Sequence, residues 1–213
     1  TEIAIISVSK NDKVLHSINN HHKKEHASFL QPAVKELLKE SGLSFKDLNA
    51  ISVAAGPGSY TGIRVGMASS IGFCYALNIP LITVNTLEIM ALSAIKTKSI
   101  ISDASILYCP MIDARRMEVF TALYDKHLKE KISPCAKILA EDFLKDELEN
   151  NTILFFGSGS IKIKSLLQNK NAIFYDIQTM PESLVFLANK ELEKNIFTDL
   201  IYARPSYIKS FGT

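Results

Sequence analysis

The chain has 213 residues, 47% of them hydrophobic, and a formal net charge of +2 at pH 7. That length fits one domain or two small ones with a buried core, and the charge is too small to imply a nucleic-acid binder by electrostatics. No hydrophobic run approaches the roughly 20 residues of a membrane-spanning helix, and no signal peptide is visible. Cys74, Cys109 and Cys135 have no metal-ligand spacing, so we expect thiols in a reducing cytosol.

In the first half of the chain, the spacing of apolar residues is in some segments that of a strand and in others that of a helix. The pattern predicts a hairpin, an amphipathic helix and a buried strand, and then, after the stretch at 56–77, another strand and another helix. These elements are expected at 2–9, 14–20, 26–41, 50–55, 80–84 and 86–96. The four-residue spacing of His22 and His26 could place both on one helix face for a metal, but we favour a solvated loop leading into the helix.

The stretch at 56–77 begins Gly-Pro-Gly-Ser-Tyr-Thr-Gly. A strand is therefore expected to enter a tight turn that opens a helix, with Ser59 or Thr61 as its cap and Asn78 at its end. Residues at helical spacing form one stripe, which consists of Gly62, Gly66, Ser69, Phe73 and Ala76. Glycine inside a helix costs roughly 1 kcal/mol against alanine, so we expect something to pack close to this stripe.

Three interpretations of this stretch are open. It could be a strand-to-helix turn with close packing, a phosphate-binding loop at a helix N-terminus, or a helix that docks on a partner. The glycines are spaced G-x-G-x-x-x-G, unlike the dinucleotide-binding fingerprint, and no lysine follows as in a P-loop. The stripe of small residues favours the docking helix.

The second half of the chain again alternates strands and helices. Strands are expected at 105–112, 117–124, 152–156 and 172–176, helices at 140–149, 160–168 and 181–194, and an extended tail from 201. In the turn between the strands at 105–112 and 117–124, Asp113, Arg115 and Arg116 could bind a phosphate or a partner, but we favour an ion-paired turn. The glycine-containing turn at 157–160 is a weak phosphate-site candidate.

Several motifs resemble those of the TsaB (YeaZ-type) family. The most specific is Gly-Pro-Gly-Ser-Tyr-Thr-Gly-Ile-Arg-Val-Gly at 56–66 followed by Ile-Pro-Leu-Ile-Thr-Val-Asn-Thr-Leu-Glu at 79–88, and others lie at 26–32, 113–120 and 204–209. The resemblance implies an α/β, two-lobed actin-like (ASKHA, ribonuclease-H-like) fold. It also implies a cytoplasmic role in placing threonylcarbamoyl on the adenosine beside the anticodon of certain tRNAs.

By this resemblance, the chain is expected to be a non-catalytic scaffold that activates a TsaD-type transferase and binds it through the first two helices. A TsaE-type ATPase is the expected third component, and a homodimer is expected when the chain is alone. The balanced charge and scattered lysines of the chain give no basic stripe, so contact with tRNA is expected to be only indirect. The expected partner or dimer interface consists of His26, Phe29, Leu30, Ala33, Gly62, Arg64, Val65, Gly66, Ser69 and Phe73. Small residues allow close helix approach, and burial of apolar neighbours contributes about 25 cal/mol per Å².

The resemblance also bears on catalysis. TsaD-type transferases carry a His-x-x-x-His metal pair, and the corresponding positions here are Thr86 and Met90, which are unsuited to a hard or borderline cation. The chain is therefore expected not to be an enzyme and to have no catalytic residue, metal or cofactor, although ATP binding stays open. The alternative is an actin-like-fold enzyme in its own right, either an ATP-dependent transferase or a glycoprotease-like protein.

Two lobes are expected, an N-terminal one at 1–103 that carries the partner-binding helices and a C-terminal one at 104–213. The polar stretch at 96–103 is the expected hinge. TsaB-like proteins usually begin with an apolar strand and an Asp-Thr-Ser-Thr-Glu-like turn. Only the end of that turn is visible at Thr1-Glu2, so a first strand is expected to be missing from this sequence.

Overall fold

The computed structural model of the 213-residue chain describes residues 3–20, 26–97 and 105–208. Its contacts form two units, the first from Thr1–Thr86 and Met180–Ser206 and the second from Leu87–Thr179 and Tyr207–Thr213. The expected division at 103/104 falls in a stretch outside the described residues. The units differ from that division because two helices bury their apolar faces elsewhere than expected, α3 (Thr86–Lys96) in the second unit and α6 (Pro181–Glu193) in the first.

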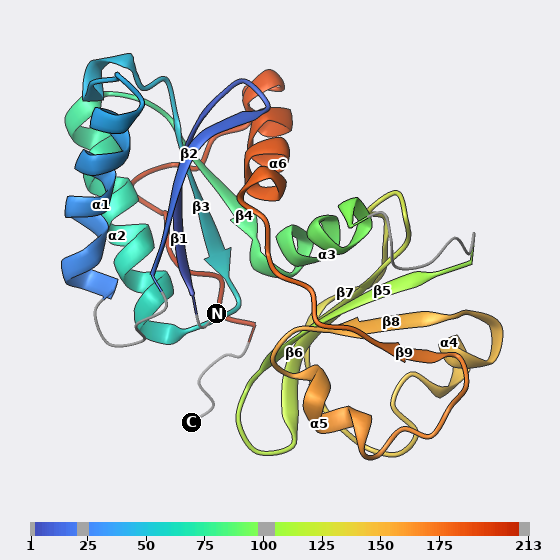
Figure 1. The fold of residues 1–213 in the computed structure, drawn as a ribbon. Coiled ribbons are helices and arrows are strands. Elements are labelled where there is room, and N and C mark those ends of the chain that lie inside the picture. Colours follow the sequence, from blue (N-terminus) through green and yellow to red (C-terminus); the bar gives the residue numbers. More distant parts are fainter. Residues whose placement is uncertain (1–2, 21–25, 98–104, 209–213) are drawn as a thin grey trace. The chain divides into compact units, whose positions relative to one another are not determined.

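The first unit contains two two-stranded sheets between helices (Figure 1). An antiparallel hairpin forms one sheet, and two parallel strands joined through a helix form the other. The strands are β1 (Ala4–Lys10), β2 (Lys13–Asn20), β3 (Ile51–Gly56) and β4 (Leu81–Asn85). Helix α1 (His26–Glu40) packs on the hairpin and α2 (Tyr60–Leu77) on the parallel pair, while α6 contacts all four strands. A short 3₁₀ helix, η1 (Phe45–Asp47), precedes β3.

The helices of this unit form where apolar residues recur at helical spacing. Helix α1 buries Leu37 and Leu38, and α2 buries Met67 and Cys74, which are seven residues apart and share one face. Met67 and Cys74 pack against Ala55 of β3 and Leu81 of β4. The strands and helices expected at 2–96 are thus confirmed, with boundary differences of a few residues.

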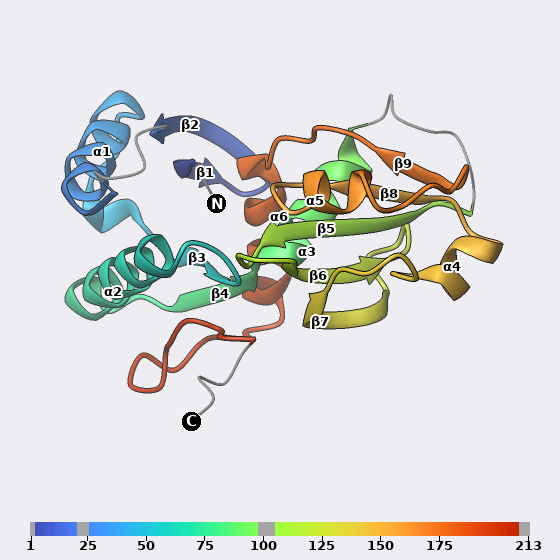
Figure 2. The ribbon, with the colours of Figure 1, turned by 90° about the horizontal axis from the view of Figure 1, so that it is seen from below.

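The second unit is built on one five-stranded sheet in the order β7-β6-β5-β8-β9 (Figure 2). Strand β6 pairs antiparallel with both β7 and β5, whereas β5, β8 and β9 run parallel to one another. The strands are β5 (Leu107–Asp113), β6 (Glu118–Tyr124), β7 (Glu130–Ile138), β8 (Ile153–Phe156) and β9 (Ala172–Phe174), and the short helices are α4 (Lys145–Asn150) and α5 (Ser160–Lys164).

Alternate residues of the central strand β5 face opposite sides of this sheet. Tyr108 and Ile112 belong to a buried cluster that includes the apolar face of α3. Cys109 and Met111 belong to a second cluster, which includes residues of α4 and α5. The central strands are therefore buried on both faces, which explains why their sequences are almost continuously apolar.

Strand β7 is absent from the sequence-based expectation. Its residues include Pro134, Lys131 and Lys137, a composition that argues against a central strand. Among the described strands β7 pairs with β6 alone and lies at the edge of the sheet, so it tolerates the proline and the lysines. Two expected helices are also shorter than predicted: α4 begins at Lys145, after Leu144 with φ of 54°, and α5 ends at Lys164. Within the described residues, no helix is long and apolar enough to cross a membrane.

Candidate partner-binding face

The loop that precedes α2 is covered by the chain's own C-terminal segment. Gly56 has φ of +114°, and a Cβ atom on it would lie 2.9 Å from the carbonyl oxygen of Ser206. The Ser206 amide in turn donates to the carbonyl oxygen of Ala55 at 2.7 Å. Glycine is required here by its conformation and by a close backbone neighbour, so a phosphate-binding loop is not needed to explain it.

The limits of α2 follow the expected local signals. The Ser59 hydroxyl accepts a hydrogen bond from the Gly62 amide at 3.3 Å, which confirms Ser59 as the cap. At the other end, Asn78 adopts the left-handed conformation with φ of 53°, as expected for a residue that ends a helix.

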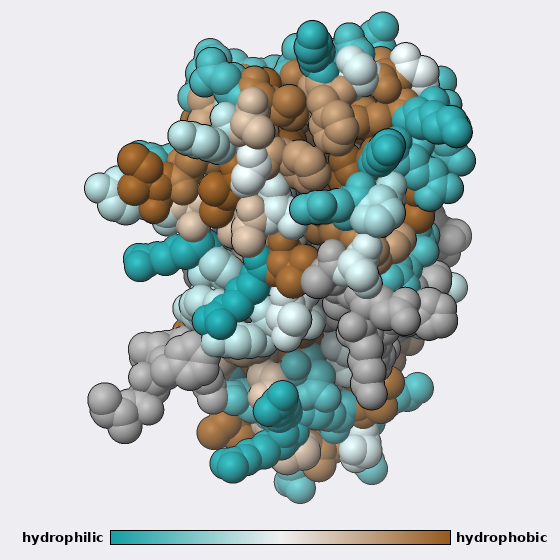
Figure 3. All heavy atoms as spheres, turned by 90° about the vertical axis from the view of Figure 1, so that its left-hand side faces the viewer, coloured by the Kyte–Doolittle hydropathy of each residue, from teal (hydrophilic) through white to brown (hydrophobic). Residues whose placement is uncertain are grey.

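One face of α2 is exposed and almost without charge. Arg64 is the only charged residue among the helix's 18. After Tyr60 at its first position, the exposed residues of the helix lie mostly three or four positions apart: Thr61, Arg64, Ala68, Gly72, Tyr75 and Ala76. Tyr75 is 82% exposed, and, apart from the adjoining residues and the backbone of its own helix, no described heavy atom lies within 4 Å of a Cβ placed on Gly72. Figure 3 looks onto the side of the molecule that carries α1 and α2 and shows hydrophobic side chains gathered there. We call these six residues the α2 stripe.

The stripe expected from the sequence lies partly inside the unit. A Cβ atom on Gly66 would lie 3.6 Å from Cγ2 of Val53 in β3, an ordinary van der Waals distance. The Phe73 ring stacks on Phe45 with 5.7 Å between centroids. These two residues therefore face neighbours of the same unit, and Gly66 does not need an unusually close partner.

The other expected interface residues are distributed between core and surface. Ala33 is buried, with 2% exposure, and the His26 side chain lies outside the described side chains. Half-buried residues are Phe29, Leu30, Gly62, Val65 and Ser69. Arg64 is exposed, and its guanidinium lies 3.8 Å from the centroid of the Tyr60 ring. Sequence reasoning missed Ala68, Gly72 and Tyr75, which the lack of charge along the helix could have indicated.

Thr86 and Met90, the positions compared with a metal-binding pair, are both buried, with 4% and 8% exposure. The Thr86 hydroxyl has no hydrogen-bond partner among the described residues. Met90 packs in the core cluster around α3. Within the described residues no group of three or more His, Cys, Asp or Glu is placed to hold a metal ion.

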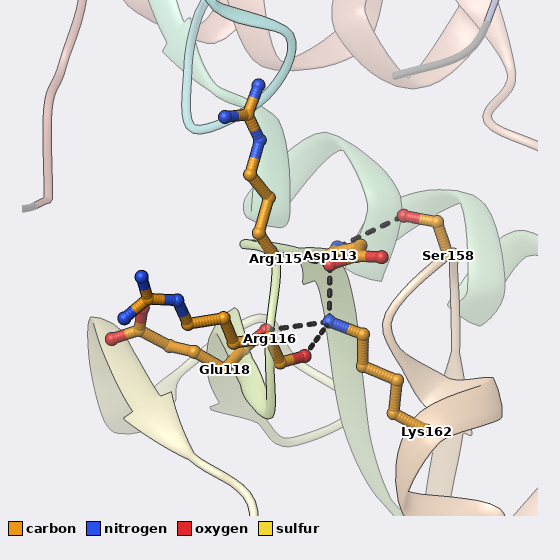
Figure 4. A network of polar contacts seen from close by, with 6 residues as sticks. All are labelled: Asp113, Arg115, Arg116, Glu118, Ser158 and Lys162. Atoms are coloured by element: carbon orange, nitrogen blue, oxygen red, sulfur yellow. Dashed lines mark hydrogen bonds and ion pairs between the residues drawn. The ribbon is translucent and has the colours of Figure 1, made fainter.

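The turn between β5 and β6 is ion-paired, but through a lysine rather than an arginine (Figure 4). Nζ of Lys162 donates to Asp113 Oδ1 at 2.5 Å, to the carbonyl oxygen of Arg116 at 2.5 Å and to that of Glu118 at 3.3 Å. The hydrogen bond from Lys162 holds the pKa of Asp113 below its ordinary value. Nothing in the sequence pairs these residues, because Lys162 and Asp113 are 49 positions apart.

The glycines of the turn at 157–160 are explained by packing. A Cβ atom on Gly157 would lie 2.5 Å from the carbonyl oxygen of Met111, and one on Gly159 would lie 2.7 Å from Cγ1 of Val119. The helix that follows, α5, has only five residues. The turn thus brings β8 and α5 against β5 and β6, and the interpretation as a phosphate site loses its main support.

Sequence comparisons identify similar proteins across most of the chain. The family model described as TsaD, tRNA N6-adenosine threonylcarbamoyltransferase, matches residues 13–212. A Bacillus subtilis protein named tRNA threonylcarbamoyladenosine biosynthesis protein TsaB is 32% identical over 167 residues, which are 77% of this chain and 70% of that protein. A protein of the same name from Buchnera aphidicola is 28% identical over 212 residues, 92% of this chain and 90% of that protein.

Two solved structures share the fold. One is described as an uncharacterized protein with similarity to peptidase YEAZ from Pseudomonas aeruginosa, with a TM-score of 0.84, 22% identity and coverage of 98% of this chain and 95% of that one. The other is YeaZ from Pseudomonas aeruginosa, with a TM-score of 0.74, 22% identity and coverage of 96% and 95%. Together with the family match, they confirm the expected α/β actin-like fold.

Proposed function

The chain belongs to the TsaB (YeaZ-type) family, and from this premise we propose that it is a non-catalytic subunit in tRNA threonylcarbamoyladenosine biosynthesis that binds a TsaD-type transferase. The names of its relatives support the role in that biosynthesis. The proposed complex is cytoplasmic and includes a TsaE-type ATPase, and two copies of the chain pair through the same face when the transferase is absent.

The α2 stripe is the observation that carries the docking part of the proposal. A helix whose outer face meets only water normally carries charged residues there. On α2 that face offers Ala68, Gly72 and Ala76 with the large apolar ring of Tyr75 at one end. Small side chains let a partner helix approach closely, and Tyr75 supplies apolar area to bury. Phe29 and Leu30 of α1, both half-buried, extend the proposed face.

The non-catalytic part of the proposal is supported by Thr86 and Met90. Neither side chain is a ligand for a hard or borderline cation, and both are packed in the interior. A subunit without its own metal chemistry would act by holding the transferase in a competent conformation. A calorimetric titration of the isolated chain with ATP and Mg²⁺ tests the enzyme alternative, which micromolar binding would revive.

The docking proposal is tested by size-exclusion chromatography with light scattering, on the chain alone and mixed with the TsaD-type protein of the same organism. The informative variant is Ala68→Arg, which puts a long charged side chain in the middle of the α2 stripe. The control is Gln168→Arg, which adds the same charge at an exposed residue of the second unit. Gly66→Leu is less informative, because the new side chain would press on Val53 inside the unit.

We expect a one-to-one species for the wild-type chain and for Gln168→Arg, and its loss for Ala68→Arg with the circular dichroism spectrum unchanged. A complex that survives Ala68→Arg with the same affinity would show that the transferase docks elsewhere. A wild-type chain that stays a homodimer and never binds the transferase, even with ATP and the TsaE-type protein present, would overturn the proposed function.

A further inference from the structure

We propose that the β5–β6 turn contacts the phosphate backbone of RNA through Arg115 and Arg116. This inference rests on the proposed function, because it assigns the turn to the RNA on which that complex acts. It differs from the expectation of only indirect contact, which came from the balanced charge of the whole chain. A local pair of arginines on a fixed turn is compatible with a net charge of only +2.

The turn is held in one conformation by its own hydrogen bonds. Arg115 and Arg116 have φ of 70° and 47°, and such left-handed conformations are costly for residues other than glycine. The Asp113 carboxylate accepts a hydrogen bond from the Arg115 amide at 2.7 Å, and the Ser158 hydroxyl accepts one from the Asp113 amide at 3.1 Å. Backbone strain that is stabilised in this way is typical of functional sites.

Lys162 completes the turn and leaves the arginine side chains available. The Asp113 carboxylate is already paired, because its Oδ1 accepts hydrogen bonds from Lys162 Nζ and from the Arg115 amide. Both arginines are exposed. Within the described part of the chain, no hydrogen bond or ion pair involves either guanidinium. Figure 4 shows the Arg115 side chain directed away from this network, whereas Arg116 extends to the same side as Glu118.

The directions of the two side chains favour a polyanion over a single phosphate. In Figure 4 the guanidinium groups diverge from neighbouring backbone positions, so they are suited to two phosphates along a strand. Guanidinium is the side chain best suited to phosphate, since its planar donors can form two parallel hydrogen bonds. Arginine is also scarce here. The chain has four arginines among its 24 basic residues, and two of the four are adjacent in this turn.

The test measures fluorescence anisotropy of a labelled tRNA with the one-to-one complex and, in parallel, with the isolated chain, over a series of salt concentrations. The variant is the double substitution Arg115→Gln with Arg116→Gln. The matched control is Lys126→Gln with Lys129→Gln, which removes two positive charges from the exposed β6–β7 turn of the same sheet. Light scattering on the same samples reports whether the complex forms.

We expect the double arginine variant to bind tRNA about tenfold more weakly at low salt and to reduce the slope of log Kd against log salt by about 1.5, since each phosphate contact contributes roughly 0.7 to 0.9. The lysine control should keep the wild-type slope. Arg115→Gln alone should weaken tRNA binding more than Arg116→Gln alone. The Glu118 carboxylate lies on the side of Arg116, and its negative charge opposes a phosphate there.

Each of four other results would overturn the inference: no binding of tRNA by the wild-type complex or chain, no effect of the arginine substitutions, an equal effect of the lysine control, or an effect on ATP binding alone. If the arginine substitutions abolished binding of the transferase and left the affinity for RNA unchanged, the turn would be a protein contact, and the inference would also be overturned. If the wild-type chain does not bind the transferase, the proposed function fails, and the isotherm of the isolated chain still decides the role of the turn.

Discussion

The terminal methyl carbon of Met90 lies 2.6 Å from the point that a Cβ atom on Gly157 would occupy. The carbonyl oxygen of Met111 lies 2.5 Å from the same point. Helix α3, strand β5 and the turn after β8 therefore meet where there is no room for a side chain. Met90 fills the interior at this meeting point, at the position where a TsaD-type transferase is expected to carry a metal-binding histidine.

Two glycines are predicted to respond to alanine in opposite directions. Gly157→Ala should lower the free energy of unfolding by about 2 kcal/mol or more, because the residue has φ of +90° and its Cβ would clash with backbone. Gly72→Ala should raise it by roughly 0.5–1 kcal/mol, because nothing lies within 4 Å of its Cβ in a helix. Urea unfolding measures both changes. A Gly157→Ala protein as stable as wild type would contradict the packing at this turn.

The ion pair between Asp113 and Lys162 is predicted to make stability depend on pH at the acidic end. The pKa of Asp113 is lowered from 3.8, chiefly by the hydrogen bond from Lys162. A carboxyl group with a lowered folded-state pKa stabilises the fold above its unfolded-state pKa, and this stabilisation is lost as the pH falls through the folded-state value. Asp113→Asn should therefore be less stable than wild type at neutral pH, and the difference should decrease as the pH falls below 3.8 and through the lowered pKa of Asp113.

Urea midpoints at neutral and acidic pH measure this difference. Asp142→Asn is the control, because it removes one exposed carboxylate that has no ion pair among the described residues. If the difference in urea midpoint between wild type and Asp113→Asn stayed constant down to the lowest pH measured, the ion pair would not be the cause of the difference in stability.

The three thiols are predicted to react at different rates in the folded protein. Burial raises the pKa of Cys74 to about 11 and that of Cys109 to about 12, so almost none of either is thiolate at pH 8. Cys135 also has a raised pKa through burial but is only partly buried. A disulfide reagent should label Cys135 first and the other two only after unfolding in urea. Rapid labelling of Cys109 in the native protein would show that the sheet opens locally.

The Tyr124 hydroxyl is predicted to cost stability. Its oxygen is buried without a hydrogen-bond partner among the described residues, and burial raises the pKa of Tyr124. Tyr124→Phe keeps the ring and removes the unpaired group, so the free energy of unfolding should rise by about 1 kcal/mol. Tyr124→Leu, which leaves a cavity, should lower it. Thermal unfolding measures both, and a loss of stability in Tyr124→Phe would show that the hydroxyl has a partner, such as a water.

Strong local signals in the sequence predicted the elements that depend on a few neighbouring residues. Helix α2 begins at the Ser59 cap and ends at Asn78 because both act within one helical turn. The apolar runs of β5 and β8 likewise indicated strands. The family resemblance, rather than any periodicity, predicted the actin-like fold and Thr86 and Met90 as the positions to compare with a metal pair.

Other features depend on residues that are far apart in the chain, and only the tertiary structure decided them. Strand β7 is a strand because β6 pairs with it, despite Pro134. Gly66 of α2 faces inward and Gly72 outward because β3 lies on one side of the helix. Helix α6 returns to the first unit, and Lys162 reaches Asp113 across 49 positions. Local periodicity shows that a helix has an apolar face, but which neighbour covers that face depends on how the whole chain packs.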